Sequence, residues 1–136
     1  MPMMRIRQAA ELLGVSDDTV RRWIDNGALS ASQDDAGRKV IAGHVLAEFW
    51  RKNARPLPPN PLGTGSSARN RFVGLVTNVI SDKVMTQVEM QCGPHTVVSL
   101  MSTEAAQQLK LEPGSLAVAL VKATTVIVET PRAFAD

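Results

Sequence analysis

A charge-free run of prolines, glycines and serines divides this chain into two short halves. In the sequence PLPPNPLGTGSS, residues 56–67, four prolines come first, followed by two glycines and two serines. Proline-rich chain is extended and stiff, whereas glycine and serine make chain flexible, so we expect a linker here. With 136 residues in all, the sequence predicts one small domain over 1–55, a linker over 56–65 and a second small domain over 66–136.

The composition limits the kinds of protein that these halves can form. The chain is 44% hydrophobic and 21% charged, which is typical of a globular protein. The single cysteine, Cys92, excludes an internal disulfide framework, and His44 and His95 are too few and too scattered for a structural zinc site. We see no signal-peptide pattern, no transmembrane run and no nucleophile–base constellation. We therefore expect a cytoplasmic protein that has no metal site and is not an enzyme.

Charge is spread evenly enough to exclude a basic arm. Residues 1–55 carry 9 Lys or Arg and 7 Asp or Glu, and residues 69–136 carry 6 of each sign. Any contact with nucleic acid must therefore come from a local cluster of cations.

The first half shows a helix-turn-helix pattern. Apolar residues at helical spacing predict a first helix that ends at Gly14 and a second that ends at Asn26-Gly27. Ser16 stands where an N-cap is needed, and two aspartates follow it in the first turn. The apolar faces consist of Ile6, Ala9, Ala10 and Leu13 in the first helix and of Val20, Trp23 and Ile24 in the second.

A hairpin and a third helix follow. Residues 29–31 and 40–41 flank a turn in Asp-Asp-Ala-Gly, residues 34–37, and Val45, Leu46, Phe49 and Trp50 mark a helix to Asn53. Trp23 and Trp50 are expected to pack in the core, and His44 to face solvent. Helix, turn, helix, hairpin and helix form a winged-helix arrangement. The segment IRQAAELLGVSDDTVRRWIDNG resembles the MerR-like and excisionase-like winged-helix family over about residues 4–53.

This resemblance implies binding to double-stranded DNA. Steps of 100° place Arg22 opposite the apolar face of the second helix, where an arginine can bond guanine or phosphate. The simpler interpretation is that Asp18 and Arg22 only pair on a solvated helix face. The predicted DNA-binding residues, including two at the hairpin tip, are Thr19, Arg21, Arg22, Arg38 and Lys39.

The second half shows short strands. The patterns predict strands over 72–80, 84–91, 96–101, 116–122 and 124–129, with a short helix that Ser102 caps. Five strands and one helix in about 65 residues suggest a small barrel of the OB type. The predicted fold class is thus α+β, a winged helix-turn-helix domain followed by a five-stranded OB-type barrel.

Several motifs in this half resemble those of the Mop, or molybdate-binding TOBE, family. Ser67-Ala68-Arg69-Asn70 opens the barrel, and Val121-Lys122-Ala123-Thr124 stands near its end. The resemblance covers about residues 66–130. It implies a homo-oligomer that binds molybdate or tungstate between subunits, with ligands at Ser67, Arg69, Ser102, Lys122 and Ala123.

The chemistry of these residue types suits such an ion. Molybdate is a tetrahedral dianion that accepts hydrogen bonds, so it needs hydroxyl and N–H donors and a cation such as Lys122. Ser102 adds a hydroxyl at a helix start, where free N–H groups favour anions. Each residue also has a simpler interpretation, because Ser67 could belong to the linker, Ser102 could only cap a helix, and Lys122 could be an ordinary lysine at a strand end.

The sequence therefore favours a molybdate- or tungstate-binding transcriptional regulator. One alternative is a molybdate storage or homeostasis protein whose winged helix serves assembly. Another is an excisionase-like architectural DNA binder whose barrel only oligomerises. The sequence leaves open the operator, the direction of regulation, the preference between the two ions and the size of the oligomer.

Overall fold

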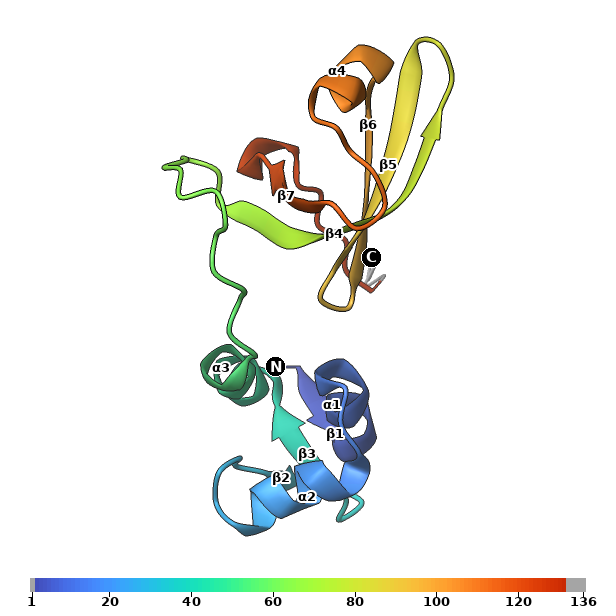
Figure 1. Cartoon of the computed structure of the whole chain (residues 1–136). Helices are drawn as coiled ribbons and strands as arrows, with labels where there is room; N and C mark the ends of the chain where they lie inside the picture. The colour runs from blue at the N-terminus through green and yellow to red at the C-terminus, as the bar shows by residue number, and fades with distance from the viewer. Residues whose placement is uncertain (1, 132–136) are drawn as a thin grey trace. The chain divides into compact units, whose positions relative to one another are not determined.

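The computed structural model describes residues 2–131, and the chain divides into two compact units between Pro56 and Leu57 (Figure 1). Residue 1 and residues 132–136, which the predicted domains include, lie outside the described part. Each unit has its own core and its own sheet and is described separately below.

The first unit combines three helices with a small antiparallel sheet. Its strands lie in the order β1-β3-β2, with Met3 opposite Ala42 and Ser32 opposite Val40. Along the chain the elements are β1 (Met3–Arg5), α1 (Ile6–Leu13), α2 (Asp17–Asp25), β2 (Ser32–Gln33), β3 (Lys39–Ala42) and α3 (Gly43–Asn53). The sequence did not predict β1, because three residues are too few for a periodic pattern.

Capping residues set the helix ends where the sequence predicted them. Gly14 takes a left-handed conformation (φ 70°), and its N–H bonds the carbonyls of Ala10 and Glu11 at the end of α1. The Ser16 hydroxyl accepts a hydrogen bond from the Thr19 amide and so caps α2. The turn between the two predicted helices is confirmed.

The core of the first unit lies between the helices and the sheet. Its buried residues include Ala9, Val20, Leu29, Ile41 and Leu46, and the Trp23 and Phe49 rings pack with centroids 5.0 Å apart. The prediction that Trp50 packs in the core is wrong, because its side chain is 41% exposed. Trp50 follows Phe49 by one 100° step and so lies at the margin of the buried face of α3.

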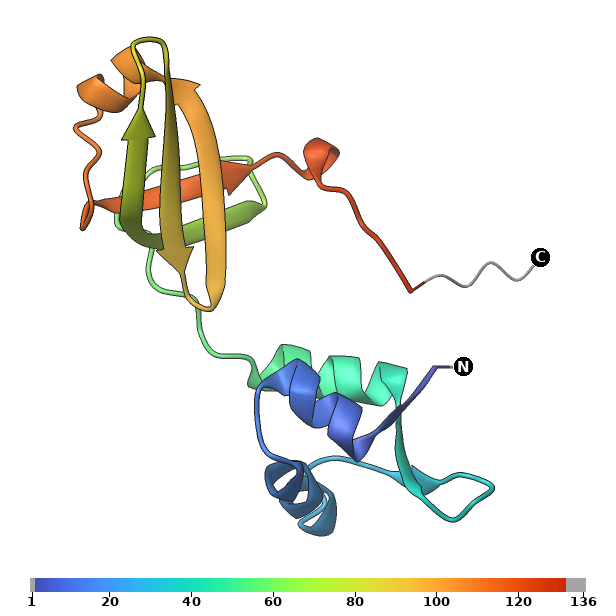
Figure 2. The same cartoon turned by 90° about the vertical axis from the view of Figure 1, so that its right-hand side faces the viewer.

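The second unit is a four-stranded antiparallel sheet with one short helix (Figure 2). Its strands lie in the order β6-β5-β4-β7, and a bulge at Thr77 interrupts the pairing of β4 with β5. Along the chain the elements are β4 (Asn70–Ser81), β5 (Met85–Cys92), β6 (His95–Ser102), α4 (Thr103–Gln108), β7 (Leu116–Val121) and the 3₁₀ turn η1 (Ala123–Thr125).

The core of this unit lies on one face of the sheet. Val76, Val88, Met90 and Cys92 are buried there, with Phe72 and Ala119 packed against them. Gly74 lets β4 approach β5 closely, because a Cβ at this position would collide with the Gln91 carbonyl and the Cys92 sulfur.

The fifth predicted strand, residues 124–129, is not a strand in the structure. Residues 123–125 form η1 instead, and no strand follows among residues 126–131. A strand needs a neighbour to satisfy its backbone, and this segment pairs with no other described segment. Ile127 and Val128 are consequently 85% and 82% exposed. Within residues 57–131 the sheet is therefore a four-stranded half-barrel.

Candidate functional sites

Four of the five predicted oxyanion ligands gather at one end of the β4–β7 pair. The two strands are antiparallel and in register from Asn70 opposite Val121 to Leu75 opposite Leu116. Ser67 and Arg69 precede β4, whereas Lys122 and Ala123 follow β7, so strand pairing alone brings these residues to the same edge. All four are exposed, as a binding site for an ion from solution requires.

Two side chains hold the backbone at this edge. The Asn70 amide Nδ2 donates to the Val121 carbonyl at 3.1 Å, and the Thr125 hydroxyl donates to the Lys122 carbonyl at 2.8 Å. The Thr125 backbone N–H reaches the same Lys122 oxygen at 3.0 Å. The carbonyls on either side of the Lys122 amide are therefore both occupied.

Ser102 lies at the other end of the sheet. It pairs with Met85 at the start of β5, and Ser81 at the far end of β4 pairs with Thr86 nearby. Twelve residues separate this end from Arg69, which is roughly 40 Å along the strand at about 3.3 Å per residue. The structure thus does not bring Ser102 to the other four predicted ligands within one chain.

Ser102 is held in place by its own surroundings. Its hydroxyl caps α4 by accepting from the Ala105 amide at 3.1 Å, which leaves its O–H hydrogen free to donate. A chain of hydroxyls runs from the exposed Ser81 to the buried Thr86 (2.8 Å) and on to the buried Thr103 (2.9 Å). Sequence reasoning missed these groups, because threonines in strands ordinarily serve as β-formers.

A carboxylate is also present at the Ser102 end. Asp82 accepts hydrogen bonds from the Met85 and Val84 amides, which lower the pKa of its carboxyl below the usual value. The Thr103 hydroxyl donates to the Asp82 carbonyl at 2.9 Å and joins this turn to the start of α4. The Ser102 end of the sheet is therefore structurally fixed and contains a negative charge.

Arg71 is a cation that sequence reasoning missed. It pairs with Leu120, on the opposite face from the core residues Phe72 and Ala119. Its Nε is buried and has no hydrogen-bond partner among residues 2–131. The alternation in the sequence RNRF could have shown that Arg71 lies on the face opposite to Phe72.

The predicted DNA-binding cations lie on α2 and the following hairpin. Arg21 pairs with Asp18 (3.4 Å), Arg38 with Asp34 (3.0 Å) and Lys39 with Asp25 (3.7 Å). The Lys39–Asp25 pair joins the start of β3 to the end of α2, so these elements present one surface. Arg22 is exposed on it and has no ion-pair partner in the part of the chain that the structure describes. The Thr19 hydroxyl lies 3.0 Å from that of Ser16 and so takes part in the helix cap.

The hairpin tip is ordered by Asp34. Its carboxylate accepts from the backbone amides of Arg38 (2.9 Å) and Ala36 (3.0 Å) and from the Arg38 side chain. These bonds, the Arg38 amide foremost, lower the pKa of the Asp34 carboxyl. Arg38 is consequently held at the tip, in the position that the sequence predicted for a phosphate contact.

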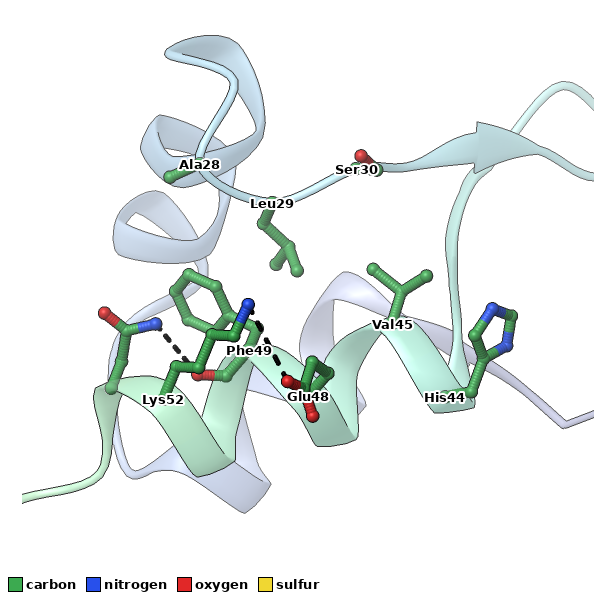
Figure 3. Close-up of a pocket in the computed structure, with 9 residues that line it drawn as sticks. Ala28, Leu29, Ser30, His44, Val45, Glu48, Phe49 and Lys52 are labelled. Carbon is green, nitrogen blue, oxygen red and sulfur yellow. Dashed lines mark hydrogen bonds and ion pairs between the residues drawn. The ribbon is translucent and has the colours of Figure 1, made fainter.

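A groove of about 380 Å³ lies in the first unit, between α3 and the segment that follows α2 (Figure 3). Glu48 on its wall is bonded by Arg51, which lowers the pKa of the glutamate, and it also pairs with Lys52. None of the predicted site residues lies in this groove. It is lined by Ala28, Leu29, Ser30, His44, Val45, Glu48, Phe49, Lys52 and Asn53.

Among residues 2–131, no group of three or more His, Cys, Asp or Glu side chains could hold a metal ion. In the same range no helix combines the length and apolar character needed to cross a membrane.

Comparison with known families identifies both units. Residues 3–54 match the model of a helix-turn-helix domain, and residues 66–128 match the model of the TOBE domain. The chain therefore carries a helix-turn-helix domain followed by a TOBE domain, as the motifs predicted.

Individual relatives match about half of the chain. The "Molybdenum transport protein ModE" of Herbaspirillum seropedicae is 41% identical over 66 residues, which are 48% of this chain and 24% of that protein. This chain thus spans about a quarter of that relative's length. A molybdate-binding protein from Sporomusa ovata is 28% identical, with a TM-score of 0.47 over 49% of this chain and 100% of its own. The cytoplasmic molybdate-binding protein ModG is 32% identical, with a TM-score of 0.49 over 53% of this chain and 52% of its own.

Proposed function

We propose that this chain is a DNA-binding transcriptional regulator that senses molybdate or tungstate. The observation that carries this proposal is the presence of a helix-turn-helix domain and a TOBE domain in one chain, together with a relative that is named a molybdenum transport protein. The first unit would bind double-stranded DNA as a winged helix, and the second would bind the ion as an OB-type barrel. Neither role requires catalysis, so we assign no enzymatic activity, and we place the protein in the cytoplasm.

The geometry supports an oxyanion site that two copies of the chain share. A dianion that loses water must be met by cations and by directed donors. Arg69 and Lys122 supply the charge at one end of the sheet, with Ser67 and the Ala123 amide beside them. Because Ser102 lies at the opposite end, it would join the site from a second copy.

The surface of the second unit also favours a homo-oligomer. Leu75, Leu116 and Leu120 lie on the face of β4 and β7 that points away from the core, and they are 50%, 60% and 51% exposed. Adjacent exposed leucines are typical of a surface that another protein covers. Covering this face would also bring a second copy close to the cations at its end.

The DNA-binding surface would be formed by α2 and the hairpin. Arg22 is available to read a base, Arg21, Arg38 and Lys39 would contact phosphates after exchanging their aspartate partners, and Thr19 lies at the start of the helix. Because the ion would bind between subunits, its arrival would change their arrangement and hence the spacing of the two DNA half-sites that a dimer can reach.

Calorimetry and a DNA-binding assay test this proposal together. We expect the full chain to bind molybdate or tungstate and to discriminate against sulfate, because a cavity fitted to the larger ion leaves sulfate with stretched hydrogen bonds. We also expect the ion to change the affinity for DNA that is selected from a random library at constant salt. Equal affinity for sulfate and molybdate would contradict the site assignment.

A storage or homeostasis protein is the second candidate. It is favoured by the aspartates that already pair with Arg21, Arg38 and Lys39, because these pairs reduce the positive charge of the predicted DNA-binding surface. Molybdate binding without any sequence-selective DNA binding would support this second function. DNA binding that does not respond to the ion would instead support an architectural DNA binder.

A further inference from the structure

The backbone around Lys122 is held by two side chains from opposite directions in the sequence. Asn70, at the first position of β4, donates to the Val121 carbonyl across 51 residues of chain. Thr125, inside η1, donates to the Lys122 carbonyl with both its hydroxyl and its backbone N–H. We propose that Asn70 and Thr125 are positioning residues for the oxyanion site, an inference that rests on the proposed function of this domain.

Peptide geometry gives these two bonds their effect. A peptide unit is planar, and in the trans form its C=O and the following N–H point in opposite directions. No cis peptide bond occurs among residues 2–131. Holding the Val121 carbonyl toward Asn70 therefore turns the Lys122 N–H away from β4. Holding the Lys122 carbonyl toward Thr125 turns the Ala123 N–H away from η1.

We call the contacts of Asn70 with Val121 and of Thr125 with Lys122 the clamp. The backbone segment that the clamp holds has to be rigid to bind an oxyanion. An amide recognises an oxyanion by direction, so it contributes most when its orientation is fixed before the ion arrives. The end of β7 would otherwise fray, because its ladder stops at Val121 and Lys122, Ala123 and Thr125 are all exposed. Asn70 adds a bond at the last residue pair, and Thr125 adds one just beyond it.

The same clamp sets the distance between the two binding segments. Asn70 directly follows Arg69, and Val121 directly precedes Lys122. The Asn70–Val121 bond therefore joins the residues that flank both predicted cations. Removing it would loosen the Arg69 and Lys122 segments relative to each other without removing either cation.

Matched substitutions separate this role from a general effect on folding. Asn70→Leu and Thr125→Val remove one donor each and keep the branching of the side chain. Asn78→Leu and Thr130→Val make the same chemical changes at exposed positions whose side chains donate no hydrogen bond to another described residue. Thr125→Ser keeps the hydroxyl and should restore binding.

The test combines titration of sodium molybdate by calorimetry with thermal unfolding and amide hydrogen exchange of the full chain. We expect Asn70→Leu and Thr125→Val each to raise the Kd roughly tenfold, the range known for residues that orient ligands of a bound ion. The controls and Thr125→Ser should stay within about twofold of wild type, and the unfolding midpoints of all variants should agree. Exchange of the amides of residues 121–125 should accelerate in the two clamp variants even without molybdate.

Two outcomes would overturn the assignment. One is wild-type affinity in both clamp variants, and the other is an equal loss of affinity in the controls. Should Asn70→Leu fail to fold, Thr125→Val decides, because it leaves the Thr125 backbone bond to Lys122 in place. Should the wild-type chain bind no molybdate, the proposed function fails, and unchanged exchange at residues 121–125 in both variants would then separately refute the clamp.

Discussion

The two units of this chain differ in whether the cations of their predicted binding sites are paired with carboxylates. Every ion pair among residues 2–131 lies in the first unit, where Asp18, Asp25 and Asp34 each hold a cation of the predicted DNA-binding surface. In the second unit Arg69, Arg71 and Lys122 lie near one another, and none has an acidic partner within the described residues. A phosphate that contacts Arg21, Arg38 or Lys39 must therefore displace a carboxylate, whereas a small dianion meets unpaired cations in the second unit.

The difference fits the ligand that each unit would bind, which is a polyanion with many phosphates for the first unit and a single small dianion for the second. DNA offers many phosphates, so weak exchangeable pairs suffice and keep the surface from binding every polyanion tightly. A single oxyanion contacts only the few groups that surround it, so each cation in its site has to be free of other charged partners. The predictions below test this contrast, from the largest expected effect to the smallest.

The largest effect is expected from the unpaired lysine at the end of β7. Lys122→Ala should abolish molybdate binding or weaken it by at least about a hundredfold, because an enclosed dianion then lacks a counter-charge. Calorimetry with Lys110→Ala as control measures this, since Lys110 lies away from the cluster and should not matter. Normal binding by Lys122→Ala would refute the assigned site.

The Ala123 amide should be nearly as important. Ala123→Pro removes the N–H at the first position of η1, where proline fits, and Lys122 already has the extended backbone (φ −64°, ψ 136°) that precedes proline readily. We expect a large loss of molybdate affinity with an unchanged unfolding midpoint. Ala123→Ser retains the N–H and should bind normally, so parallel titrations of the two variants isolate the amide.

In the first unit Arg22 should have the largest effect on DNA. If Arg22 reads a base, Arg22→Ala should weaken specific binding by about 1–3 kcal/mol, measured by fluorescence anisotropy on a selected operator. Lys39→Ala should instead weaken binding to all sequences and reduce the salt dependence. Unchanged DNA affinity in a folded Arg21/Arg22 double variant would remove this surface from the proposal.

Relieving an ion pair should have a smaller effect of the opposite sign. Asp25→Asn frees Lys39 and removes a negative charge from the predicted surface, so non-specific DNA binding should strengthen by about 0.2–1 kcal/mol at low salt. The corresponding change in the second unit, Glu129→Gln, removes a carboxylate that pairs with no described cation and should leave molybdate affinity unchanged. A weaker DNA complex of Asp25→Asn would show that the Lys39–Asp25 pair orders the surface instead of masking it.

The smallest effect concerns pH. The pKa of Asp34 is lowered in the folded chain, so the stability that its ionised form contributes is present above the unfolded value of about 3.8 and is lost as pH falls through the lower folded pKa. Thermal unfolding at pH 5 and pH 3 should therefore show a slightly larger acid loss for wild type than for Asp34→Asn. Identical losses would mean that the hairpin tip does not depend on this carboxylate.

Local signals allowed most of the fold to be predicted. Gly14 and Ser16 marked helix ends because capping depends on neighbouring residues alone. Strand 124–129 was predicted wrongly because its apolar residues favour a strand, whereas a strand also requires a partner that residues 2–131 do not provide. The prediction for Trp50 was wrong because a shift of one residue along a helix turns the side chain by 100°, which moves it from the centre of the buried face to its margin.

The oxyanion site was predictable only through the family resemblance and remains a prediction. Ser67 and Lys122 lie 55 positions apart in the sequence, and only the β4–β7 register brings their segments together. The role of Arg71 was not predictable, because no pattern in the sequence indicates that its Nε is buried without a hydrogen-bond partner among the described residues. The hydroxyl chain behind Ser102 depends on three segments of the second unit and has no signature in any one of them.

The extra residue at Thr77 changes which numbered positions of β4 face the core. Before it, the even-numbered residues Phe72, Gly74 and Val76 face the core, whereas after it the odd-numbered Val79 does, opposite Val88. Deleting Thr77 would therefore leave every core contact in phase and remove only the bend that the bulge introduces. The bend thus sets the direction of one end of β4, next to Lys122, relative to the other end, next to Ser102, while the core contacts stay the same. A change at this one position would alter how copies of this domain meet without altering its core.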